Sequence, residues 1–147
     1  MIITFCGHSD YRRRVEDEER IFAFLEELAG NEPLELYLGG YGGFDSFALK
    51  CGEVYQKLHP NVKLVWVTPY LDPKHRKNPD IEIQRYDEIV YPGLEQIPPR
   101  FAISHRNRWM VEQADAVIAF VSHEWGGAYK MLFYAKRKGR RILNLAQ

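Results

Sequence analysis

The sequence lacks the features that assign many proteins to a class at once. Its 20 basic and 20 acidic side chains cancel, so the formal net charge is zero. Dedicated nucleic-acid binders usually carry a large basic excess, and this balance argues against nucleic acid as a partner. No stretch approaches the roughly 18 consecutive apolar residues that span a bilayer, which argues against a membrane protein.

Cysteine is also scarce. Cys6 and Cys51 are the only two cysteines, and they lack metal-ligand spacing. They predict two buried, reduced thiols rather than a disulfide, which is typical of an intracellular protein. The N-terminal segment MIITFCGHSD has a short apolar run and no basic start, so it predicts no signal peptide. We therefore expect a cytoplasmic protein.

Several catalytic and ligand-binding motifs are absent. The sequence contains no GxxxxGKS/T, GxSxG or HExxH pattern, which argues against a P-loop, a hydrolase nucleophile elbow and a zincin site. The five histidines show no paired metal spacing, so we predict no metal site. A Ser/His/Asp triad stays open, and no cofactor is predicted beyond a bound nucleotide.

What the sequence does contain is an alternation of apolar, β-rich runs and amphipathic helical stretches. This alternation predicts a parallel sheet with helices on both faces. We expect one α/β domain over residues 1–147, Rossmann-like and doubly wound, with a mainly parallel sheet of about five strands. The predicted strands cover 2–6, 34–38, 62–68, 116–121 and 141–145, and the predicted helices 14–28, 44–58, 100–113 and 129–138.

The connection over residues 69–99 is longer than an ordinary loop and is rich in proline and charge. Such a connection is either a functional lid or partly structured. A short strand at 88–91 is one such structured piece.

Four segments follow predicted strands and should line one edge of the sheet. In a doubly wound sheet, ligands bind at the carboxyl ends of the strands. This convergence is stronger evidence than any single motif. The predicted ligand-binding residues are Gly7, His8, Gly39, Gly40, Gly42, Gly43, Asp45, Thr68, Pro69, Arg106, Ser122, Gly126 and Gly127.

The first glycine loop reads GGYGGFD over residues 39–45. Its glycines permit close backbone approach, and the start of the following helix favours an anion. Asp45 stands where a GxGxxG fingerprint needs its third glycine, so it fits ribose hydroxyls better than a pyrophosphate. The alternative is a plain glycine turn with Asp45 as the helix N-cap.

The second glycine loop, SHEWGGA, repeats this pattern after the strand at 116–121. Gly126 and Gly127 stand at a helix start, and the alternative is an ordinary turn with Trp125 as a packing residue. Upstream, Arg106 and Arg108 are two residues apart on a helix and point in different directions. At most one of them faces a phosphate, and the sequence leaves open which one.

These pieces resemble the SLOG superfamily. The resemblance rests on GGYGGFD and on RNRWMVEQADAVIAFV ahead of the second glycine loop, where Arg106, Met110 and Asp115 reproduce the spacing of the lonely-guy proteins. That superfamily also includes DNA processing protein A and small bacterial and phage proteins. The order of elements matches over nearly the whole chain, and the resemblance implies a Rossmann-like fold, a nucleotide-like ligand and a homodimer.

The sequence departs from the lonely-guy enzymes at their catalytic motif. Those enzymes carry PGGxGTxxE, where this chain has VSHEWGGAYKM, and Glu124 precedes the glycines instead of following them. In this respect the chain is most similar to the small YspA/YpsA-like members.

Three functions follow, in order of preference. The first is a sensor or sequestering module that binds a nucleotide or nucleotide-derived signal. The second is a nucleotide N-glycosidase of the phosphoribohydrolase type, in which Glu124, Asp45 or Asp115 stabilises an oxocarbenium-like transition state. The third is a protein-interaction component with its tryptophans at a partner surface, for which core packing is the alternative.

Overall fold

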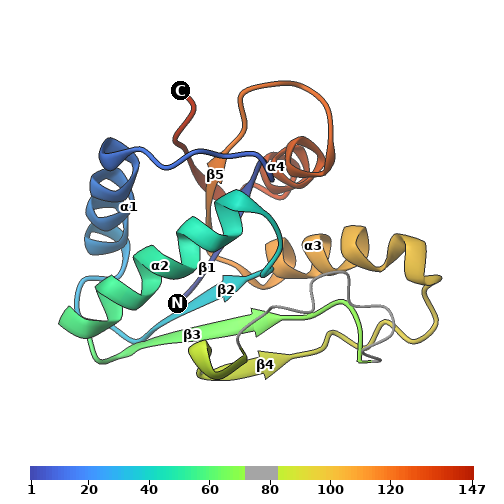
Figure 1. The fold of residues 1–147 in the computed structure, drawn as a ribbon, viewed down its shortest axis with the longest axis horizontal. Coiled ribbons are helices and arrows are strands. Elements are labelled where there is room, and N and C mark those ends of the chain that lie inside the picture. Colours follow the sequence, from blue (N-terminus) through green and yellow to red (C-terminus); the bar gives the residue numbers. More distant parts are fainter. Residues whose placement is uncertain (72–82) are drawn as a thin grey trace.

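The structure is a computed structural model that describes residues 1–71 and 83–147. Its centre is one sheet of six parallel strands in the order β4-β3-β2-β1-β5-β6 (Figure 1). The strands are β1 (Ile2–Gly7), β2 (Leu34–Leu38), β3 (Val62–Val67), β4 (Glu88–Val90), β5 (Ala116–Phe120) and β6 (Arg141–Asn144). The predicted Rossmann-like, doubly wound class is confirmed.

The prediction of about five strands was low by one. The sixth strand, β4, is three residues long and pairs only with β3 among the described residues. Glu88 and Ile89 are exposed on this edge strand. A short strand with little burial carries almost none of the apolar signal that marks the central strands.

Four helices cover the two faces of the sheet (Figure 1). They are α1 (Val15–Leu28), α2 (Gly43–Leu58), α3 (Ala102–Gln113) and α4 (Gly127–Arg137). The residues of α1 and α2 pack into one core, and those of α3 and α4 into a second core on the opposite face. In β1, Ile3 and Phe5 enter the first core and Cys6 enters the second, as expected when side chains alternate along a strand.

The helix predictions were accurate to within about two residues. The predicted start of α3 was Arg100, but Pro99–Phe101 forms a separate 3-10 turn before the α-helix begins at Ala102. A second 3-10 turn, Ile83–Arg85, precedes β4, so the described parts of the 69–99 connection are partly structured. The lid hypothesis falls largely on residues 72–82, which lie outside the described residues.

The order of the strands reverses beside β1. The chain builds outward from β1 through β2 and β3 to β4, and then returns to place β5 on the other side of β1. Loops that follow β1 and β5 therefore leave the sheet in opposite directions and open a crevice between them. This reversal locates the expected ligand site at the carboxyl ends of β1 and β5.

Candidate functional site

A cleft of about 390 Å³ opens at this reversal point. Its walls are residues 7–10 after β1, Tyr41 and Asp45 around the start of α2, Arg106 and Asn107 of α3, and the first turn of α4. We call it the sheet-edge cleft. Segments far apart in the sequence thus meet where parallel-sheet topology predicts a ligand.

Six of the predicted ligand-binding residues line the sheet-edge cleft: Gly7, His8, Asp45, Arg106, Gly126 and Gly127. The other predicted residues lie outside its lining: Gly39, Gly40, Gly42, Gly43, Thr68, Pro69 and Ser122. Glu124 is exposed and also lies outside it. Asp115 accepts a hydrogen bond from the Ile2 amide at 2.9 Å, so it ties the start of β1 to β5.

The glycines at the start of α2 are packed against the protein's own backbone. A Cβ on Gly43 would lie 2.8 Å from the carbonyl oxygens of both Ser9 and Tyr11. The amide of Gly43 already donates to the Ser9 carbonyl at 2.8 Å, and that of Phe44 to the His8 carbonyl at 3.3 Å. The loop after β1 therefore fills the position where an anion would bind.

Gly39 and Gly40 are also constrained by neighbouring side chains. A Cβ on Gly40 would lie 2.8 Å from Nε1 of Trp66, and one on Gly39 would lie 3.0 Å from the Asp45 carboxylate. Gly40 has φ +69°, which side-chain-bearing residues rarely adopt. The first glycine loop is thus explained by internal packing, and direct ligand contacts by its glycines stay a prediction.

The glycine pair at the start of α4 has the same backbone shape but an open environment. Gly126 has φ 92° and ψ 175°, and its counterpart Gly42 has φ 91° and ψ 178°. A Cβ on Gly126 or Gly127 would meet nothing within 4 Å. The amides of Gly127 and Ala128 have no hydrogen-bond partner within residues 1–71 and 83–147. Two similar turns therefore differ in whether the protein itself fills them.

Beside the open turn stands a stack of three rings. His8 stacks on His123 with 3.9 Å between ring centroids, and His123 stacks on Trp125 at 3.8 Å. Trp125 ends the stack and is 70% exposed. The interpretation of Trp125 as a packing residue was wrong, because its loop projects from the sheet edge and no core element covers the ring. Trp66, by contrast, is 2% exposed and belongs to the core.

His8 holds the two loops together in its neutral form. Its Nε2 accepts a hydrogen bond from the Ser122 amide at 2.9 Å, which requires an unprotonated Nε2. Partial burial lowers the pKa of His8 below its ordinary 6.5, and repulsion by His123 lowers it further. The ring thereby couples the loop after β1 to the loop after β5.

Arg106 connects the cleft to the ends of two strands. It is 3% exposed, and its Nη1 donates to the carbonyl of Val67 at 2.7 Å and of Gly39 at 3.0 Å. Its Nε donates to Asn107 at 2.9 Å, and Nη2 has no hydrogen-bond partner among the described parts of the chain. Arg106 is thus the arginine that lines the sheet-edge cleft, whereas Arg108 is exposed and lines a different groove.

Asp45 is one of two carboxylates that line the sheet-edge cleft, the other being the exposed Asp10. Asp45 is the third residue of α2, whose N-cap is Gly42, so the interpretation of Asp45 as the N-cap was wrong. Instead it reaches back and accepts the Tyr41 amide at 3.0 Å. Burial raises the pKa of Asp45 from 3.8 to about 6, against the opposing attraction of Arg106.

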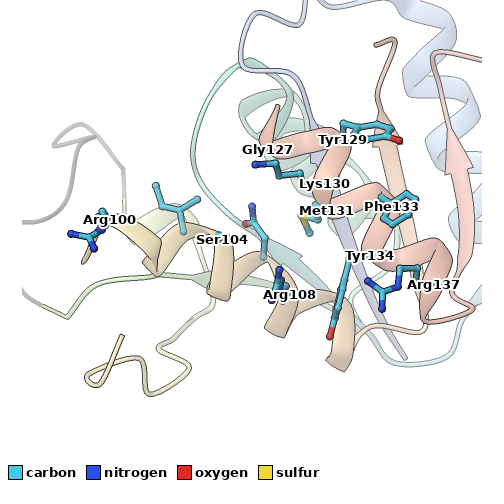
Figure 2. Close-up of a pocket in the computed structure, with 12 residues that line it drawn as sticks. Arg100, Ser104, Arg108, Gly127, Tyr129, Lys130, Met131, Phe133, Tyr134 and Arg137 are labelled. Carbon is cyan, nitrogen blue, oxygen red and sulfur yellow. The ribbon is translucent and has the colours of Figure 1, made fainter. Parts of the chain in front are cut away.

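A second groove of about 410 Å³ lies between α3 and α4 (Figure 2). It shares Ile103, Asn107, Gly127 and Met131 with the sheet-edge cleft, so the two hollows adjoin. We call it the α3–α4 groove. The groove was not predicted: basic and aromatic residues recur at helical spacing within 129–138, but this spacing does not show that α3 lies alongside.

Comparisons with solved structures show which fold this is. DNA processing protein A from Streptococcus pneumoniae superposes with a TM-score of 0.65 over 95% of this chain, at 20% identity. DNA processing protein A from Helicobacter pylori gives 0.64 over 97%, at 18% identity, and the structural-genomics target TM1055 gives 0.58 over 96%, at 14% identity. These likenesses show the fold: the chain has the Rossmann-like α/β fold of these structures.

The chain covers only part of the length of each of those structures. The chain spans 48% and 63% of the two DNA processing protein A chains and 71% of TM1055. Among curated proteins, the uncharacterized SPbeta prophage-derived protein YoqJ of Bacillus subtilis (strain 168) is 26% identical over 137 residues. That match covers 82% of this chain and 80% of YoqJ, and no family profile matches the chain.

The described part of the chain shows neither a metal-binding cluster nor a membrane-spanning helix. Within residues 1–71 and 83–147, no group of three or more His, Cys, Asp or Glu side chains is arranged to hold a metal ion. None of the helices described there has the length and apolar character needed to cross a membrane. Cys6 and Cys51 are both free and buried, as predicted.

Proposed function

We propose that this protein binds a nucleotide, or a nucleotide-derived signal, in the sheet-edge cleft. One observation carries the proposal: an unfilled glycine turn at the start of α4 lies beside a ring stack that ends in an exposed tryptophan. A nucleotide combines an anionic phosphate with a flat base. The cleft offers one matching feature for each.

The phosphate belongs at the start of α4. Helix N-termini attract anions because their first amides lack partners within the helix and the helix dipole is positive there. The amides of Gly127 and Ala128 lie at this end of an 11-residue helix. The absence of any atom within 4 Å of a Cβ on Gly127 leaves room for close approach by a phosphate. Nη2 of Arg106 is a further donor in the same cleft.

The base belongs against Trp125. Stacking of a base on an aromatic side chain contributes about 1–3 kcal/mol to binding. Trp125 is already supported on one side by His123 and His8, which fixes the plane of its ring. Tyr41, also exposed, lines the same cleft. The sugar then falls nearer Asp45, whose oxygens can accept from ribose hydroxyls.

The comparisons agree with a ligand of this class. The structure from Helicobacter pylori is described as showing a single-stranded DNA binding mode, and such a strand is built from nucleotides. The zero net charge of this chain would argue against nucleic acid as a partner only if the charges were spread evenly. They are not, because cations gather along the α3–α4 groove. The sheet-edge cleft, with a volume of about 390 Å³, is proposed to hold a single nucleotide of such a strand.

Thermal unfolding with added nucleotides tests the proposal. AMP at 100 times its dissociation constant should raise the Tm by roughly 5–10 °C, and adenosine should raise it less because it lacks the phosphate. Gly127→Leu places a side chain in open space and should fold but lose the response to AMP. Val15→Leu, at the exposed start of α1, is the matched control and should keep it. A panel of nucleotides, NAD and cyclic nucleotides without any Tm response would overturn the proposal.

A nucleotide N-glycosidase is the second candidate, and Asp45 favours it. A carboxyl group whose pKa lies at about 6 in a ligand cleft is suited to proton transfer near neutral pH. The lonely-guy catalytic motif is absent and Glu124 lies outside the cleft, so Asp45 takes the acid–base role in this alternative. Release of adenine from AMP, abolished in Asp45→Asn, would establish the enzyme. AMP binding without adenine release would rule out the enzyme and support the binding function.

A further inference from the structure

Among residues 1–71 and 83–147, the lining of the α3–α4 groove contains four cations and no carboxylate. Arg100 and Arg108 approach it from the α3 side, and Lys130 and Arg137 from α4 (Figure 2). All four side chains are exposed. In a chain whose charges cancel overall, this is a strong local excess of one sign.

Among the described residues, none of these four cations forms an ion pair with a carboxylate. The ion pairs found across residues 1–71 and 83–147 engage other basic residues, such as Arg14 with Asp17 and Arg141 with Glu27, and none involves the four groove cations. Unpaired surface cations arranged along one groove attract a polyanion and release its counterions on binding.

Aromatic rings are interleaved with the cations on α4. Lys130, Phe133, Tyr134 and Arg137 follow one another at i, i+3, i+4 and i+7, which places them along one face of the helix. Phe133 is 49% exposed. The guanidinium of Arg108 lies 5.6 Å from the centre of the Tyr134 ring, so the two helices present a mixed cationic and aromatic surface (Figure 2).

We propose that the α3–α4 groove binds a single-stranded nucleic acid. Cations that track a phosphate backbone and rings on which bases stack are the two parts of such a surface. An acidic peptide would use the cations but not the exposed rings, and a duplex keeps its base faces hidden. The groove adjoins the sheet-edge cleft through Asn107 and Gly127, so a strand can lie along both. Binding of a single strand in the groove does not require that a mononucleotide binds in the cleft.

Fluorescence anisotropy of labelled dT12 tests this proposal on the full chain. The wild type should bind dT12 with a salt-dependent affinity, and a slope of about −3 in log K against log salt is expected for four phosphate contacts. Arg108→Ala with Arg137→Ala should reduce the magnitude of the slope to about 1.4, since two contacts remain. Phe133→Ser should weaken binding roughly tenfold or more with an unchanged slope. Labelled U12 distinguishes RNA from DNA, and a labelled duplex should bind more weakly than either.

The matched control is Lys50→Ala with Lys57→Ala, two exposed cations on α2 at the opposite face. It should bind dT12 like the wild type. Equal losses in the control and groove variants would overturn the proposal, as would absence of dT12 binding by the wild type or tighter binding of the duplex. Groove variants should keep the Tm response to AMP. A wild type that binds dT12 through the groove but fails with every mononucleotide would overturn only the function proposed for the cleft.

Discussion

At the scale of single residues, the sheet-edge cleft contains two titratable side chains whose pKa values are shifted in opposite directions. His8 is held neutral because its Nε2 accepts the Ser122 amide, and Asp45 holds its proton to higher pH because it is buried. Neither state follows from the sequence alone. His8 was predicted as a ligand contact and Asp45 as a cap or sugar contact, but Ser122, which donates to His8, and Arg106, whose charge acts on Asp45, come from distant segments of the chain.

The pKa of His8 should lie below 6.5 in the folded protein. Its bond to Ser122 is present at neutral pH and is lost as pH falls through that lowered pKa, so its contribution to stability is lost on the acid side. NMR titration of the His8 ring measures this directly. His123→Gln should move the pKa back toward 6.5, because it removes the repulsion by His123. A pKa at or above 6.5 in the wild type would contradict this environment.

Asp45 should give the opposite pH dependence. Because its pKa is raised from 3.8 to about 6, the folded state binds a proton more tightly than the unfolded state does. The free energy of unfolding therefore loses a contribution of about 3 kcal/mol as pH rises from below about 4 to above about 6. Urea denaturation of the wild type and Asp45→Asn across this range measures the difference. Parallel pH profiles for the two proteins would rule out a raised pKa.

At the scale of elements, the two glycine turns are the most informative comparison. Gly43 and Gly127 both occupy the first position of a helix behind a positive-φ glycine. The sequence indicates two glycine-rich helix starts but not which one is free. What fills the first turn is the backbone of residues 9–11, a contact that depends on how the loop after β1 folds back over α2.

Alanine substitutions should separate the two turns. Gly43→Ala places a Cβ against two backbone carbonyls and should destabilise the fold by about 1–3 kcal/mol. Gly127→Ala meets no atom and should leave the stability unchanged or raise it by up to about 1 kcal/mol, because alanine favours the helix. Urea denaturation at constant pH gives both values. Equal losses in the two variants would contradict the distinction between a filled and an open turn.

At the scale of the whole molecule, one sheet separates two cores. Leu36 lies in the core under α1 and α2, and Val117 in the core under α3 and α4; neither is accessible to solvent. The alternation of elements predicted this arrangement, because near-continuous apolar strands need a cover on both faces. The point where strand order reverses is where we propose that the ligand binds.

Both cores should unfold together. Leu36→Ala should destabilise the protein by about 2–5 kcal/mol and lower the Tm by roughly 4–20 °C. Val117→Ala should lower the same transition, since the two residues belong to β2 and β5, which pair with β1 on its two sides in one sheet. Differential scanning calorimetry should show a single peak in each variant. Two separate peaks, each shifted by only one substitution, would contradict the prediction of one domain over residues 1–147.

The α3–α4 groove could not be predicted from the sequence. Arg100 and Arg137 are far apart along the chain, and the zero net charge conceals their convergence. The sequence also left open whether Trp125 packs in the core or lies at the surface, where the structure exposes it. Both depend on how α3 and the loop after β5 lie against α4, which is a property of tertiary packing.

An NMR titration of the ¹⁵N-labelled protein with AMP decides whether the open turn at the start of α4 is the phosphate site. The largest shifts should occur at the amides of Gly127 and Ala128 and at the indole N–H of Trp125. The amide of Gly43 should shift little, because the Ser9 carbonyl already occupies it. Shifts concentrated at Gly42 and Gly43, or no shifts at millimolar AMP, would contradict a nucleotide site in the sheet-edge cleft.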